Sequence, residues 1–140
     1  MKNSNSMLDY MREVSKNQLS VHSQIASGQA PATGTGEVTI HAYLVAGTAS
    51  GTFTIDGQSY SFKAKFPFVG WANGTVNGSI NLLVSPQSLV GADTGFTFTC
   101  STTAVDFTFY LNGVAVGTFS GGDGISGGGA AAGSCDWTNG

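Results

Sequence analysis

Few residues of this chain have the chemistry of an active site. Its two histidines are His22 and His41, and its two cysteines are Cys100 and Cys135. Hydrolytic sites need a nucleophile beside a base that a third group orients, and the sequence around His41 supplies no such arrangement. Zinc sites use close pairs of histidine or cysteine, whereas these four residues occur singly. We therefore expect a protein that is not an enzyme and that uses no metal or cofactor.

The carboxylates and the glycine-rich segment also lack the pattern of a site. Glycoside hydrolysis needs two carboxyl groups facing one sugar. The acidic residues beyond the first 30 positions stand mostly at expected turns and strand ends, where such side chains usually bond to nearby backbone. They are Glu37, Asp56, Asp93, Asp106, Asp123 and Asp136. Residues 121–129 are rich in glycine but lack the Gly-Lys-Ser/Thr ending of a phosphate loop.

Three aromatic residues are the candidates for binding: Tyr43, Trp71 and Trp137. Exposed tryptophan and tyrosine on a β module can stack on sugars or lie at a membrane interface. Trp71 lies in a short turn-like segment, 69–74, and Trp137 lies in the last expected strand. The other interpretation is that one tryptophan belongs to the core and the other closes an end of the fold.

Composition indicates a small β-rich domain. The chain has 140 residues, of which 41% are hydrophobic and only 9% charged. Its 21 glycines argue against a helical protein, because each interior glycine costs a helix about 1 kcal/mol. A net charge of −3 with five lysine and arginine residues argues against a nucleic-acid partner. No segment approaches the roughly 20 apolar residues of a membrane span.

The N-terminal segment differs from the rest of the chain. Residues 1–27 carry too many charges for the apolar region of a signal peptide, but their apolar residues recur at roughly helical spacing. These residues are Met7, Tyr10, Met11, Val14, Val21 and Ile25. Residues 27–36 have the composition of a linker. We expect residues 1–36 to form an arm and linker, and residues 37–140 to form the domain. The arm is either an amphipathic helix that docks on a protein partner or membrane, or a frayed helix or tail outside the domain.

From Glu37 onward the pattern has the period of two that is typical of β-strands. Eight strands are predicted, with type I′ turns at Asp56-Gly57 and Asn112-Gly113, and the first turn pairs Phe53 with Tyr60. Each strand has one apolar face, which favours a compact, closed eight-stranded antiparallel barrel or a two-sheet sandwich. We expect a packed core rather than a ligand cavity. It should contain Phe53, Phe62, Phe66, Phe96, Phe98, Phe107 and Phe109.

The two cysteines alternate with apolar residues in their expected strands. Cys100 and Cys135 should therefore point inward and react slowly. They form either one disulfide or two buried thiols.

The order of elements over residues 67–137 resembles one protein family. Gly70-Trp71 is followed by a strand, a short helical turn over 85–90 and an aromatic strand with Phe96 and Phe98. The strand 106–111, its hairpin partner, a glycine-rich run and Trp137 complete the order. In this order and spacing the chain resembles the virulence-associated protein (Vap) family, secreted β-barrel factors of intracellular actinobacterial pathogens. The resemblance implies a compact eight-stranded barrel and a non-enzymatic factor acting at endolysosomal membranes, with no catalytic residues to transfer.

Three functions follow from these observations. The first is a secreted effector or toxin component that acts on host membranes or surfaces. The second is a module that binds carbohydrate or glycolipid through Trp71, Tyr43 or Trp137. The third is an immunity or inhibitor protein that binds one partner protein. For the first, export would use a route without a visible signal peptide, by secretion or injection; otherwise the protein is cytoplasmic.

Overall fold

The computed structural model describes residues 32–140, which form seven strands and one short 3-10 helix. The expected N-terminal helical arm lies outside the described residues. The elements are β1 (Ala32–Ile55), β2 (Gln58–Leu82), η1 (Pro86–Leu89), β3 (Thr94–Cys100), β4 (Val105–Leu111), β5 (Val114–Gly121), β6 (Ile125–Gly127) and β7 (Gly129–Asn139).

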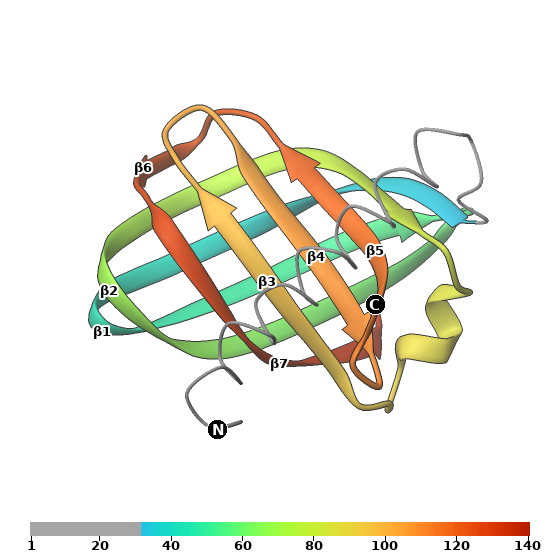
Figure 1. Cartoon of the computed structure of the whole chain (residues 1–140). Coiled ribbons are helices and arrows are strands. Elements are labelled where there is room, and N and C mark those ends of the chain that lie inside the picture. Colours follow the sequence, from blue (N-terminus) through green and yellow to red (C-terminus); the bar gives the residue numbers. More distant parts are fainter. Residues whose placement is uncertain (1–31) are drawn as a thin grey trace, which may run out of the picture.

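Five strands form a closed ring in the order β2-β5-β4-β3-β7, and the pairing of β7 with β2 completes it. β1 and β6 pair with β2 outside this ring. β2 enters the ring twice, because residues 60–64 pair with β7 and residues 78–82 pair with β5. Figure 1 shows the long β1–β2 ribbon running behind β3, β4 and β5. Of the two architectures expected for this all-β chain, the structure therefore has the barrel.

The expected count of eight strands is wrong, because four of the expected strands are joined in two pairs and one strand, β6, forms in the glycine-rich run where none was expected. β1 has 24 residues and β2 has 25. Residues 46–51 and 67–74, which were expected to separate strands, instead continue the antiparallel ladder, with one register shift between Leu44 and Ala46. A bulge can bend a paired ribbon while the flanking hydrogen bonds remain, so glycine and alanine there do not end the strand. Residues 32–36, expected in the linker, also belong to β1.

Local turn chemistry is confirmed at both predicted hairpins. Asp56 and Gly57 have φ values of 51° and 79°, and Asn112 and Gly113 have 51° and 82°. Positive φ at both central positions is the requirement of a type I′ turn. The first turn pairs Phe53 with Tyr60, as expected.

Aromatic rings fill the barrel, which confirms the predicted packed core. The seven predicted phenylalanines are all buried, and Phe68, Phe119 and Trp137 join them. The ring centroids of Phe53 and Trp137 are 5.4 Å apart, and those of Phe98 and Phe107 are 4.8 Å apart. Ring pairs in this range contribute about 0.5–1.5 kcal/mol beyond the burial of their surface.

The two halves of β1 approach each other closely at Gly34. A Cβ built on this residue would collide with the carbonyl oxygen of Thr54 and lie 2.9 Å from the Cα of Ile55. Both obstacles are backbone atoms, which cannot rotate away as the end of a side chain can. Gly34 therefore permits the ribbon to fold back on itself.

We predict that Gly34→Ala lowers the free energy of unfolding by about 1–3 kcal/mol, the usual cost of forcing an extra methyl into a packed site. Gly122→Ala is the matched control, since no atom lies within 4 Å of a Cβ at that position. Urea unfolding followed by tryptophan fluorescence measures both variants. Equal stabilities would show that the contact at Gly34 relaxes at no cost.

Candidate functional site

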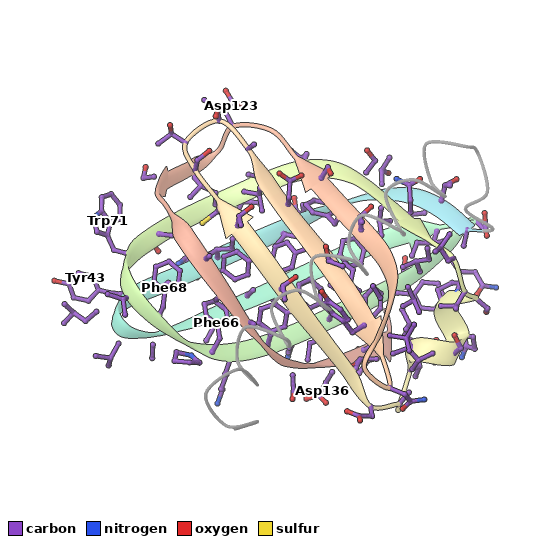
Figure 2. All side chains as sticks on the ribbon, in the orientation of Figure 1. Tyr43, Phe66, Phe68, Trp71, Asp123 and Asp136 are labelled. Atoms are coloured by element: carbon purple, nitrogen blue, oxygen red, sulfur yellow. The ribbon has the colours of Figure 1, made fainter. Side chains whose placement is uncertain are left out.

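Exposed apolar side chains gather at one end of the β1–β2 ribbon. Among the described residues, six large hydrophobic side chains are exposed, and five of them lie at this bend. We call these five residues the apolar tip: Tyr43, Leu44, Val45, Val69 and Trp71. Val69 is 94% exposed, Val45 78% and Trp71 49%. Figure 2 shows Tyr43 and Trp71 projecting from the same end of the barrel, while Phe66 and Phe68 lie toward its interior.

A register shift in the β1–β2 ladder builds this tip. Tyr43 pairs with Trp71 and Leu44 with Gly70, and pairing resumes only at Ala46. Leu44 has a φ of 63°, a left-handed conformation that is uncommon for residues other than glycine. Bulges redirect side chains and often lie beside functional sites. Here one residue of β1, Val45, stands opposite two residues of β2, Phe68 and Val69, and Val45 is left out of the ladder and in solvent.

A hollow beside the tip extends its apolar surface. It has a volume of about 390 Å³ and is lined by Val45, Pro67, Phe68, Val69 and Ala130. A second hollow, of about 500 Å³, lies on the other side of Pro67 and includes His41 and Lys65. The tip thus combines projecting side chains with one open depression, and a second depression lies next to it at Pro67.

Two lysines and one aspartate lie along the ribbon below the tip, and Lys65 is the charged residue among them that is nearest to it in the ladder. Lys63 and Lys65 are the only lysine or arginine residues within residues 32–140, and both lie exposed on β2. β2 has no acidic residue, and β1 has none after Glu37. Lys65 pairs with Thr48 and stands two positions before Pro67. Lys63 pairs across the ladder with Asp136 of β7, whereas the partner of Lys65 on β1 is neutral, so Lys65 is the positive charge that an anionic surface at the tip would meet first.

The other chemical groups near the tip are engaged with each other. The Nδ1 atom of His41 lies 2.7 Å from the Oδ1 atom of Asn73, two ladder positions from the Tyr43–Trp71 pair. Residues 32–140 contain no cluster of three or more His, Cys, Asp or Glu residues placed to hold a metal ion. No helix in that range is long and apolar enough to cross a bilayer.

The three candidate binding residues do not form one site. Tyr43 and Trp71 are brought together, but Trp137, expected as a third binding residue, is 2% exposed and stacks against Phe53 and Phe62. Its position on the inward face of β7 explains this, because alternate residues of a closed strand must fill the core. The sequence did not predict the aliphatic residues of the tip, Leu44, Val45 and Val69, as functional residues. The run Tyr43-Leu44-Val45 breaks the period of two, and this break was the available signal.

The cysteines are two free, buried thiols rather than a disulfide. Thr94 of β3 pairs with Cys135, whereas Cys100 is six residues further along β3. Six strand residues span roughly 20 Å, well beyond the reach of a disulfide. Burial raises the pKa of both thiols, that of Cys135 to about 11. The predicted inward orientation is confirmed.

The barrel is similar to solved structures of virulence-associated proteins. VapB from Rhodococcus equi aligns with a TM-score of 0.57 and 15% identity, over 76% of this chain and 96% of VapB. VapD from the same organism aligns with a TM-score of 0.55 and 17% identity, over 77% of this chain and all of VapD. No protein-family model and no characterised protein matches by sequence. The chain therefore has a Vap-like fold, as the sequence resemblance predicted.

We predict that native Cys135 reacts with a thiol reagent at pH 8 about 100-fold more slowly than in the unfolded chain. A pKa of about 11 rather than 9.0 lowers the thiolate fraction by that factor. The unfolded thiol ionises near pH 9 while the folded one stays protonated, so stability should fall as pH rises from about 9 to about 11. Peptide mapping after timed labelling separates Cys135 from Cys100. Equal native and unfolded rates would contradict the burial of this thiol.

Proposed function

We propose that this protein is a non-enzymatic effector of the virulence-associated type, released by secretion or injection, which binds host membranes through its apolar tip. The gathering of five of the six exposed large apolar residues at one bend carries the proposal. The Vap-like fold supports the virulence-associated class.

The composition of the tip fits a lipid interface. Tryptophan and tyrosine favour the headgroup region, where the ring is apolar and its polar atom stays hydrated. Leu44, Val45 and Val69 add aliphatic surface, and burying one such side chain completely contributes about 1.5–3 kcal/mol. Lys65 adds attraction to anionic lipids, and Lys63 adds less because Asp136 stands opposite it in the ladder. Elsewhere the outer faces of β1 and β2 carry mostly serine, threonine and asparagine, so attachment would be peripheral and confined to the tip.

A second candidate is binding of carbohydrate or glycolipid. The cross-strand pair of Tyr43 and Trp71 favours it, since adjacent exposed rings can stack on a sugar. Sugar sites also need polar groups that fix the hydroxyls. The three aliphatic residues of the tip offer none, which makes a membrane the better supported ligand.

We predict that the double variant Val45→Ser/Val69→Ser binds vesicles of phosphatidylcholine and phosphatidylserine at least about tenfold more weakly than the unchanged protein, because apolar surface no longer enters the lipid. Co-sedimentation measures the affinity, and the emission of Trp71 should shift to shorter wavelength on binding. Val114→Ser is the matched control, since Val114 is 60% exposed but lies at the β4–β5 turn.

Unchanged binding by the double variant, or no binding of the unchanged protein to any vesicle, would contradict a membrane role of the tip. Glycan-array binding that requires Tyr43 and Trp71 would support the second candidate instead. Capture of a single protein by the same surface would favour the immunity or inhibitor function.

We predict a charge-dependent share of the affinity. Lys63→Gln/Lys65→Gln should weaken binding to anionic vesicles by about 1 kcal/mol, most of it from Lys65 because Asp136 faces Lys63 across the ladder, and raising the salt concentration should reduce the difference. Binding to vesicles of phosphatidylcholine alone should stay the same. A loss of equal size on both kinds of vesicle would mean that the lysines act on the fold and not on lipid charge.

A further inference from the structure

One part of the outer face of the barrel is buried although it points away from the core. Phe107 and Phe109 of β4 point inward, so Thr108 between them points outward, and it is 5% exposed. Its partner across the ladder, Thr118, lies beside the inward Phe119 and is 4% exposed. Ala115 of β5 is also buried, yet it is not a member of the core cluster.

This burial is local. Further along the same two strands the outward residues Asp106 and Ser120 are exposed, and their side chains are joined by a 2.9 Å hydrogen bond. On β1, the outward Thr52 and Thr54 are exposed as well. The hydroxyl oxygen of Tyr110, which pairs with Ala115, is buried without a hydrogen-bond partner in the described part of the chain. We call Thr108, Tyr110, Ala115 and Thr118 the covered patch.

The described chain begins beside this patch. Thr33 pairs with Asn81, Asn81 with Thr118, and Thr118 with Thr108. The first residues of β1 therefore lie in the same cross-strand row as the covered patch. Three strand spacings of about 4.8 Å separate Thr33 from Thr108, roughly 14 Å in all. The 31 residues before Ala32 are more than long enough to reach across it.

We propose that the N-terminal segment of this chain, residues 7–25, docks on the covered patch with its apolar residues facing β4 and β5. The helical spacing of Met7, Tyr10, Met11 and Val14 would form one apolar stripe. The patch offers what such a stripe can pack against: small side chains on a sheet, with the ring of Tyr110 at its edge. The docking surface is distinct from the apolar tip.

The test uses the full chain and trypsin, which cleaves after Arg12 and Lys16 within the segment. Cleavage at these two positions should be at least about tenfold slower in the protein than in a synthetic peptide of residues 1–31, because proteolysis follows the population of the open form. Thr118→Glu places a charge in the covered patch and should restore the peptide's rate. Thr52→Glu is the control, at an exposed outward position, and should leave cleavage slow.

A peptide-like rate in the unchanged protein, or slow cleavage that persists in Thr118→Glu, would overturn the proposal. Slow cleavage that disappears on dilution, together with a dimer in light scattering, would also overturn it by identifying a second copy as the occupant. If Thr118→Glu does not fold, hydrogen exchange of the unchanged protein provides a second test. Backbone amides of residues 7–25 should then exchange at least about tenfold more slowly than in the peptide, and equal rates would refute docking.

Discussion

The packing of aromatic rings inside a closed sheet is the interaction on which the rest of this structure depends. Phe53 contacts rings contributed by four other strands, through Phe62, Phe109, Phe119 and Trp137. No single hairpin could bury these rings, so the interior becomes dry only when β7 returns to β2. Closure also leaves the five-stranded ring itself without a free edge.

Because the interior of the barrel is filled, any binding site is expected on its surface. Because the rings occupy the space that a ligand would need, binding has to use outward residues or an end of the barrel. Most outward positions carry small polar side chains, which solvate the surface without committing it to a partner. The apolar tip is different, since several large hydrophobic residues meet there in solvent, and contiguous exposure of this kind marks interaction sites more often than scattered residues do.

The sequence predicted those parts that local chemistry decides. Asp56-Gly57 and Asn112-Gly113 specify their turns by themselves, and alternation placed the phenylalanines and both cysteines inward. Strand continuity could not be read in this way, because glycine and alanine near residues 46–51 look like a break until a partner strand supplies their hydrogen bonds. The burial of Trp137 could not be predicted either, because the rings that surround it come from strands far away in the sequence. The pairing of Tyr43 with Trp71 depends on a bulge whose register only the folded ribbon defines.

A period-two pattern assigns every strand residue to the inside or the outside, and the fold constrains mainly the inside. Two proteins that share only 15% and 17% identity with this chain can therefore have the same barrel, because residues on the outer face can change without altering it. Function should then be sought where a residue violates its assignment. Val45 and Val69 are apolar and outside, while Thr108 and Thr118 are polar, outward and yet buried. The first kind of violation costs solvation free energy unless a ligand covers it, and the second kind requires a neighbour that is already there. The apolar tip therefore calls for an external ligand, whereas the covered patch calls for an occupant that belongs to the native protein.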